Sequence, residues 1–290
     1  MEYVIKQILN GLTAGSIYAL VAVGYGMVYG ILELINFAHG DIYMVGTFLV
    51  LTLLGYQVPF LGALLLGCLG GGIMALIAER VAYRPVRGAH RVVPMISAMG
   101  VALVMRNVAQ LVWGTETYAF PEVFPTSTLK LGTLQLSTLQ LIIFALAISL
   151  MAVLMVLVRK TKMGKAVRCV AQDIPASQLM GIPVNRTIQL VYFLGAVLGV
   201  VGGVLFSMYY AVWIGMGFLG TLMAWIACII GGIGSLEGAL AGGLLLGLGQ
   251  ALISGFVSST FRDAIVYALI IIVLVLRPRG IFARQSAEKV

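Results

Sequence analysis

Nine long apolar runs constrain the fold of this chain more than any other feature. Each run approaches the roughly 20 residues that an α-helix needs to cross the hydrocarbon core of a bilayer. Charged residues make up only 10% of the 290, whereas a soluble domain typically carries about 25%. The sequence therefore predicts an all-α, polytopic transmembrane helix bundle and excludes a soluble fold. The runs are 7–30, 40–56, 59–79, 93–113, 137–158, 187–210, 219–234, 237–257 and 263–276.

Two of these runs are short and lie beside polar or glycine-rich sequence. The run 40–56 follows polar residues that include Asn36 and His39, and the run 219–234 ends in a glycine cluster. Such segments are often broken or re-entrant helices, which membrane proteins tolerate where protein or a water-filled cavity shields the backbone. We expect about nine hydrophobic segments, some of them broken or re-entrant, within a single transmembrane domain over 1–290.

The basic residues gather in three regions, 80–91, 159–186 and 277–289. Nine crossings would place all three regions on the same side of the membrane. Cytoplasmic loops of membrane proteins are enriched in Lys and Arg. The pattern therefore predicts a cytoplasmic C-terminus and an N-terminus outside. Topology also explains the formal net charge of +8, so that nucleic acid is not an expected partner.

Motifs for chemistry are scarce in this sequence. It contains no G-x-x-x-x-G-K-[ST] loop for ATP, and its two histidines are far apart in sequence. The three cysteines are scattered without metal-binding spacing. We expect no catalytic residue, no metal and no cofactor, and hence no enzyme.

The first polar cluster comprises Glu33, Asn36, His39 and Asp41. Ionisable side chains near hydrocarbon are costly and usually face a cavity or a protein partner, which favours a role in the pathway or in gating. The alternative is an ordinary cytoplasmic turn in which Asp41 caps the next helix. Both interpretations remain open, and proton transfer by His39 is a sharper but less favoured idea.

Arg106 and Asn107 lie deep in the fourth apolar run. An arginine at this depth costs several kcal/mol unless it is paired or hydrated. We expect Arg106 to face protein and favour a structural ion pair, or a side chain that reaches outward, over a direct role in the pathway.

The segment 231–247 is rich in glycine and alanine at helical i, i+4 spacing. Small residues at this spacing let two membrane helices approach closely. Ser235 and Glu237 stand where the next helix begins, and both residue types favour a helix N-terminus. Close packing and capping are the preferred interpretation, and a conduit role for Glu237 is the alternative.

The segment 159–186 is the longest polar stretch of the chain. An apolar residue recurs there at i, i+3, i+4 and i+7, which predicts one apolar helical face. A second, short helix should follow, with Asp173 as its N-cap, Pro175 in its first turn and Gly181 as its stop. This short helix could dock another protein or lie on anionic lipid, and the residues alone leave both open. The apolar face comprises Met163, Ala166, Val167 and Val170.

Four motifs in order along the chain resemble those of branched-chain amino acid ABC transporter permeases. They are Asn36-Phe-Ala-His-Gly-Asp41, Ala171-Gln-Asp-x-x-x-Ser-x-x-Met-Gly-Ile-Pro-Val184, Gly231-Gly-Ile-Gly-Ser-x-x-Gly-Ala-x-x-Gly-Gly243 and Leu276-Arg-Pro-Arg-Gly-Ile-Phe282. Each glycine motif alone would be weak, but the four together cover nearly the whole chain.

The resemblance implies an importer subunit whose ATP hydrolysis occurs on other chains. In this family two permease subunits form the pathway, two ATP-binding cassette ATPases bind below, and an extracytoplasmic binding protein delivers substrate. We expect the second permease subunit to be a paralogue, membrane lipid to surround both, and the location to be the bacterial inner membrane. The segment 159–186 would be the cytoplasmic coupling loop. Its ATPase-coupling helix would use Asp173, Ala176, Ser177, Leu179, Met180, Gly181 and Ile182.

The same resemblance implies transport of leucine, isoleucine and valine, whereas relatives of the family handle urea or short amides. A stand-alone secondary transporter or channel is the rival from another class. That rival predicts coupling carboxylates at mid-membrane, but Glu33, Asp41 and Glu237 all lie near segment ends. A purely structural scaffold is disfavoured by the interrupted helices.

Overall fold

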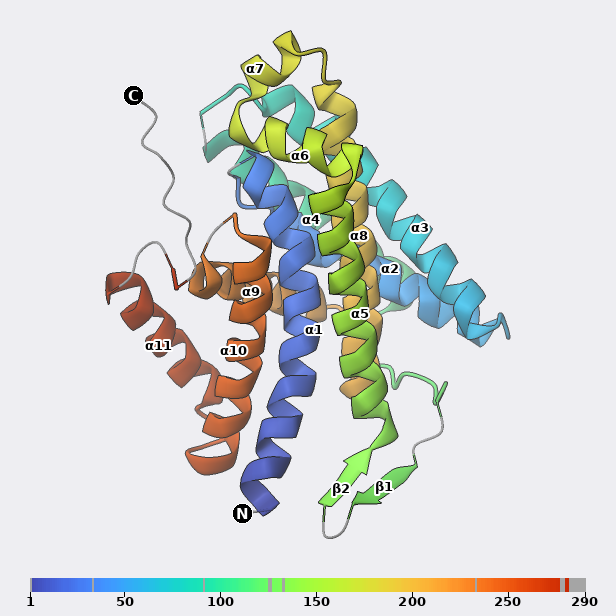
Figure 1. Ribbon diagram of the computed structural model, residues 1–290. Coiled ribbons are helices and arrows are strands. Elements are labelled where there is room, and N and C mark those ends of the chain that lie inside the picture. The colour runs from blue at the N-terminus through green and yellow to red at the C-terminus, as the bar shows by residue number, and fades with distance from the viewer. Residues whose placement is uncertain are drawn as a thin grey trace.

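A computed structural model describes the chain except for residues 1, 33, 91, 125–126, 132–133, 233, 277–279 and 282–290. The described residues are mostly helical, which confirms the predicted helical architecture (Figure 1). Each of the nine apolar runs falls on one helix. These helices are α1 (Glu2–Leu32), α2 (Ala38–Gly55), α3 (Phe60–Ala78), α4 (Val92–Trp113), α5 (Thr138–Lys160), α8 (Val184–Tyr209), α9 (Met216–Gly231), α10 (Leu236–Phe256) and α11 (Arg262–Leu276).

Shorter elements connect these helices. The sequence did not predict the antiparallel hairpin, in which Thr128 pairs with Ser137. Its two strands are only four residues each, too short for alternation to stand out from the flanking loop. The shorter elements are the π-helical turn η1 (Glu79–Tyr83), the 3-10 turn η2 (Arg84–Val86), the strands β1 (Thr128–Leu131) and β2 (Leu134–Ser137), and the helices α6 (Lys162–Gln172) and α7 (Ile174–Leu179).

Seven helical segments of the described chain are long and apolar enough to span a membrane. They comprise α1, α2, α4, α5, α8, α10 and the continuous stretch from α3 through η2. By contrast, α9 has 16 residues and α11 has 15, each short of the ~20 that a full crossing requires. The chain is therefore a multi-pass membrane protein, and the count of nine crossings stays a prediction.

The helical chain breaks at the two places where the sequence predicts interruptions. One break separates α1 from α2, and the other separates α9 from α10. Gly232 and Gly234 adopt φ angles of +105° and +83° in the second break, a backbone region that only glycine enters readily. The two breaks lie side by side, because a Cβ built on Gly30 would be 3.7 Å from the Cα of Gly234.

Helix α1 runs through the centre of the bundle and packs against α10 (Figure 1). A Cβ built on Gly247 would lie 2.2 Å from the Cα of Gly15, and one built on Gly243 would lie 2.4 Å from the Cα of Ala19. The two backbones are therefore in direct contact, which confirms the predicted close packing of this segment. Such contacts matter in lipid, where packing rather than water exclusion holds helices together.

The outer helices present apolar side chains away from the bundle. Leu65 of α3, Leu111 of α4 and Val153 of α5 are all exposed, and only about a third or less of the apolar stretch of each helix is buried. A soluble protein would not expose so much apolar surface. These faces are where lipid or a second membrane subunit would lie.

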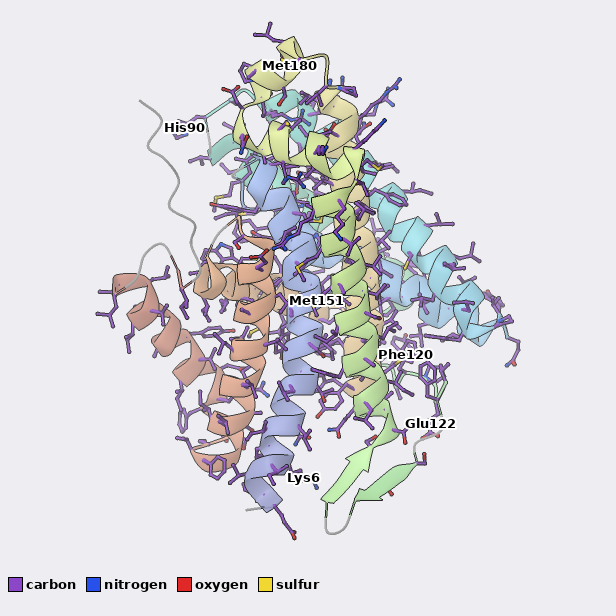
Figure 2. The ribbon with its side chains drawn as sticks, in the orientation of Figure 1. Lys6, His90, Phe120, Glu122, Met151 and Met180 are labelled. Atoms are coloured by element: carbon purple, nitrogen blue, oxygen red, sulfur yellow. The ribbon has the colours of Figure 1, made fainter. Side chains whose placement is uncertain are left out.

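The two ends of the bundle differ in content. Helices α6 and α7 lie at one end, whereas the hairpin and the N-terminus lie at the other (Figure 1). His90 and Met180 lie toward the first end, and Lys6 and Glu122 lie toward the second (Figure 2). Two of the three predicted basic regions thus share an end. Most of the third region lies outside the described residues.

Candidate functional site

An ion pair between Asp41 and Arg106 joins α2 to α4. Arg106 donates from Nε to Asp41 Oδ1 at 3.2 Å and from Nη2 to Oδ2 at 3.1 Å. The Asp41 side chain is completely buried, whereas that of Arg106 is 26% exposed. The guanidinium also lies 5.5 Å from the ring centre of Phe218, within the range of a cation–π contact. The expected protein partner of Arg106 is therefore confirmed.

Two other candidates do not join this pair. Asn107 is exposed, and its side-chain amide donates to the Leu103 carbonyl of its own helix at 2.7 Å. The helical rotation between consecutive residues turns it away from Arg106. Glu33 lies outside the described residues.

Asn36, rather than Asp41, binds the free backbone at the start of α2. Its Oδ1 accepts from the Ala38 N–H at 3.1 Å and from the Tyr83 hydroxyl at 2.6 Å. The alternative in which Asp41 caps this helix is wrong, because Asp41 lies one turn inside the helix and its carboxylate is held by Arg106. Asn36 thereby ties the break between α1 and α2 to η1.

His39 lies in the first turn of α2 and is buried. Its ring meets that of Tyr25 edge-on at 5.8 Å. Among the described residues, its Nε2 has no hydrogen-bond partner, and it points at α8, where a Cβ built on Gly199 would lie 3.3 Å away. A buried nitrogen without a partner is costly, so His39 is the polar side chain of this cluster that packing alone explains least.

Sequence reasoning missed a second buried ion pair at the end of α3. Glu79 is fully buried in η1 and forms a short ion pair with Arg87. Gln189 of α8 donates to the other carboxylate oxygen at 3.2 Å, and Arg87 donates to Asn185 at 3.1 Å. The available signal was an acidic residue at the end of an apolar run, eight residues before an arginine. It was overlooked because this region was interpreted only as a basic loop.

Ser235 and Glu237 lie at the start of α10. Ser235 Oγ accepts from the Gly238 N–H at 3.1 Å, which confirms the predicted cap. Glu237 pairs with Arg159 at the end of α5, and both side chains are more than half exposed. An exposed pair contributes little stability. Glu237 therefore lies at the surface of the same end as α6 and α7 rather than inside the bundle.

Helix α6 rests its apolar face on the bundle. Val167 and Val170 are buried, whereas Met163 is about half exposed. Thr161 caps the helix by accepting from the Gly164 N–H at 3.0 Å. The predicted apolar face is thus largely turned toward protein. Beyond α6, helix α7 is the outermost element of this end (Figure 1).

Helix α7 has the predicted boundaries. Asp173 Oδ1 accepts from the Ala176 N–H at 2.9 Å, Pro175 occupies the first turn, and Gly181 follows the helix with φ +77°. Ser177 is buried against the rest of the chain. The helix is therefore capped, terminated and anchored by its own residues.

The end of α7 presents apolar side chains outward. Leu179 is 90% exposed and Met180 is 81% exposed, and Met180 extends from the tip of the molecule (Figure 2). Ala176 and Gly181 are also exposed, and Ile182 is half-buried. An apolar helix end held away from the lipid-facing surface is suited to docking another protein.

The chain matches a family model described as "Branched-chain amino acid transport system / permease component" over residues 7–274. Three relatives show how far the similarity extends. The high-affinity branched-chain amino acid transport system permease protein LivH of Salmonella typhimurium is 37% identical, with 99% of this chain and 98% of the relative covered. BraD of Pseudomonas aeruginosa, of the same description, has the same identity and coverage. The probable LivH of Methanocaldococcus jannaschii is 29% identical, covering 93% of this chain and 88% of the relative.

Among solved structures, PsaBC from Streptococcus pneumoniae in complex with Fab has a similar fold. The TM-score is 0.50 at 13% identity, and 93% of this chain and 91% of that chain are covered. At this identity the likeness concerns the fold alone. The sequence similarity, in contrast, extends over nearly the whole chain. This chain belongs to the family of permease components of branched-chain amino acid transport systems.

Proposed function

We propose that this chain is the permease subunit of an ATP-binding cassette importer that carries leucine, isoleucine and valine across the bacterial inner membrane. Relatives that it matches over 99% of its length are named as high-affinity permeases for these amino acids. The single structural observation that carries the proposal is α7, a capped helix with an exposed apolar end on a chain that has no ATP-binding loop.

In this proposal α7 is the coupling helix, and Leu179 and Met180 insert into a groove of an ATPase subunit. Two apolar side chains this exposed gain free energy when a partner removes them from water. Asp173 keeps the helix formed in the absence of the partner, so that less ordering entropy is lost on docking. The end that carries α7 is then cytoplasmic, the N-terminus lies outside and the C-terminus is cytoplasmic.

The partners follow from the same assembly. A second permease subunit, expected to be a paralogue, would complete the pathway, two ATPase subunits would bind at the α7 end, and a binding protein would dock at the other end. The broken pairs α1–α2 and α9–α10 supply hinges, since a few residues between helices can absorb a change of backbone angles. Movement of α7 would reach these hinges through α6, which packs on the bundle core.

The test of coupling compares Leu179→Glu and Met180→Glu with Met163→Glu. All three add a carboxylate at the same end, but Met163 lies on α6 rather than on the exposed end of α7. The first two variants should fold and reach the membrane, yet lose co-purification of the ATPases and ATP-dependent leucine uptake. Retained ATPase binding and uptake in Leu179→Glu and Met180→Glu would overturn the coupling role.

The substrate is tested in proteoliposomes that contain the complete transporter and its binding protein. Leucine, isoleucine and valine should each be imported with ATP inside, whereas urea and acetamide should not compete. Import of urea or acetamide instead would show that the transporter has another class of substrate. Leucine uptake by the purified chain alone would favour a stand-alone transporter and contradict the proposal.

A further inference from the structure

A polar cavity of about 140 Å³ is lined by residues of α1, α8, α10 and α11. The N-terminus of α1 lies at the end of the molecule opposite α7 (Figure 1). The cavity is bounded by the first turns of α1, the end of α8, the second half of α10 and the start of α11. One water needs only about 10–15 Å³ on this measure, so the cavity has room for a small solute. Its polar lining includes Gln7, Asn10, Tyr209, Tyr210, Gln250 and Arg262.

Gln250 is the best-placed recognition group of this cavity. Its side chain is buried, yet within the described part of the chain the only hydrogen-bond partner of its amide nitrogen is the sulfur of Met223, at 3.3 Å. A thioether is a weak acceptor, so the carboxamide of Gln250 is held in place with much of its hydrogen-bonding capacity unused. The glycine contacts between α1 and α10, which include Gly247 in the cavity wall, fix the helix that carries it.

Asn10 of α1 contributes a second amide to the lining. Its Oδ1 accepts from the side chain of Gln140 at 2.8 Å, which orients the amide and leaves its NH₂ group as a donor. Small residues lie between the polar groups, among them Ala14 and Ala251. The cavity thus combines oriented amides with a narrow apolar wall, the usual composition of a specific small-molecule site.

Opposite charges stand next to each other where α11 begins. Arg262 donates to Asp263 from Nε to Oδ1 at 2.9 Å and from Nη2 to Oδ2 at 3.5 Å, and both side chains remain about one-third to one-half exposed. Arg262 lines the cavity, and its Nη1, which takes no part in these contacts with Asp263, can donate to a ligand carboxylate. Because Asp263 balances its charge, the pair suits a ligand that carries both charges better than a simple anion. A balanced pair also binds weakly, as a transport site must in order to release its cargo.

We propose that this cavity is a low-affinity entry site for a neutral amino acid zwitterion with a small aliphatic side chain. Arg262 binds the carboxylate, the Gln250 carboxamide binds the ammonium group, and the wall formed by Ala14, Gly247 and Ala251 contacts the side chain. The identity of the solute rests on the proposed function, whereas the presence and chemistry of the site rest on the cavity itself.

The test measures binding of radiolabelled leucine to the full chain with its ATPases in nanodiscs, without binding protein. Binding should be saturable and displaced by isoleucine and valine. Leucinamide lacks the carboxylate and 4-methylpentanoate lacks the ammonium group, so neither should compete effectively. Displacement by both analogues as well as by isoleucine would show apolar binding only and would overturn the proposal.

Arg262→Gln and Gln250→Leu should each weaken leucine binding about tenfold, since one hydrogen bond to a charged group is lost. Arg84→Gln is the matched control, because Arg84 is exposed at the opposite end, and it should bind as wild type. Arg262 is about one-third exposed, so its variant keeps the test valid if Gln250→Leu folds poorly. Unchanged binding in Arg262→Gln would overturn the site.

Leucine import by the same preparations, with binding protein added, separates the two proposals. Import without saturable binding to the chain would refute the entry site and leave the proposed function intact. Absence of import of leucine, isoleucine and valine by a complex that hydrolyses ATP would refute the proposed function. The binding and analogue measurements would then still decide the chemistry of the cavity.

Discussion

Arg106 of α4 binds both carboxylate oxygens of Asp41 of α2, at 3.2 and 3.1 Å. The Asp41 side chain has no exposed surface, whereas the Arg106 side chain is 26% exposed. The charge of Asp41 therefore depends on Arg106 for compensation more than the reverse. Since α2 follows the first helix break directly, this pair also fixes where the interrupted segment sits against the outer helix α4.

We predict that Arg106→Ala lowers the free energy of unfolding by about 3 kcal/mol, because it leaves a buried carboxylate without its partner. The apparent melting temperature of the detergent-solubilised protein should fall accordingly. Asp41→Asn with Arg106→Gln should lose less than Arg106→Ala, since the double variant has no unpaired charge. A melting temperature of Arg106→Ala equal to that of wild type would show that water compensates Asp41.

The second buried ion pair, between Glu79 and Arg87, allows a matched comparison. Arg84 lies one helical turn from Arg87 but is exposed. Arg87→Gln removes the partner of the fully buried Glu79 and should cost about 3 kcal/mol. Arg84 is exposed, so Arg84→Gln should change stability by less than about 0.5 kcal/mol. Thermal unfolding of both variants in the same detergent checks the difference.

An uncharged substitution of Glu79 provides an internal check on this ion pair. Glu79→Gln keeps a side chain that can still accept from Arg87, and it removes the buried charge. It should therefore destabilise less than Arg87→Gln does. Equal losses in these two variants would mean that the shape of the cluster, and not its charge balance, holds η1 against α8.

The sequence predicts the helices well because hydrocarbon thickness imposes length and apolarity on each segment. It also predicts α7, since Asp173, Pro175 and Gly181 are local signals that act within one short helix. The long-range polar pairs are another matter. Asp41 lies 65 residues from Arg106, and Glu79 lies 110 from Gln189. Nothing in the local sequence states which helix will lie opposite.

The same distinction explains why the sequence did not identify the residue that caps α2. Asn36 and Asp41 are both residue types that cap helices, and spacing alone did not separate them. The choice is made by Arg106, which holds Asp41, and by Tyr83, which reaches Asn36 from η1. The polar cavity near Gln250 was not predicted for a similar reason, because its lining residues come from four helices, as far apart in the sequence as α1 and α11.

His39 allows a prediction with an unusual sign. Because its Nε2 lacks a partner among the described residues, His39→Leu removes a buried polar atom that gains nothing from the fold. Removing such an atom should leave stability unchanged or raise it by about 1 kcal/mol. Loss of leucine uptake in a variant that remains fully stable would identify His39 as a functional rather than a structural residue.

A substitution at Gly199 of α8, which lies next to His39, tests the same contact from the other side. Gly199→Ala places a Cβ about 3.3 Å from Nε2 and 3.2 Å from the Cβ of Tyr43, which is tight but not impossible. A modest loss of about 1 kcal/mol is expected from this overpacking. If His39→Leu instead loses more than about 2 kcal/mol, the prediction is wrong and the ring contributes to stability through its contacts, among them the one with Tyr25.

The contact between α1 and α10 can be tested at two glycines of one helix, Gly247 and Gly249. A Cβ on Gly247 would lie 2.2 Å from the Cα of Gly15, whereas a Cβ on Gly249 would meet nothing within 4 Å. Gly247→Ala must therefore push two backbones apart and should cost about 3 kcal/mol. Gly249→Ala meets no neighbour and should gain up to about 1 kcal/mol, because alanine is the better helix former. Opposite shifts in melting temperature from the same substitution two residues apart are the expected result. Shifts of the same sign would mean that the glycine contacts do not hold α10 against α1. The cavity wall next to Gln250 would then be less rigid than the entry site requires.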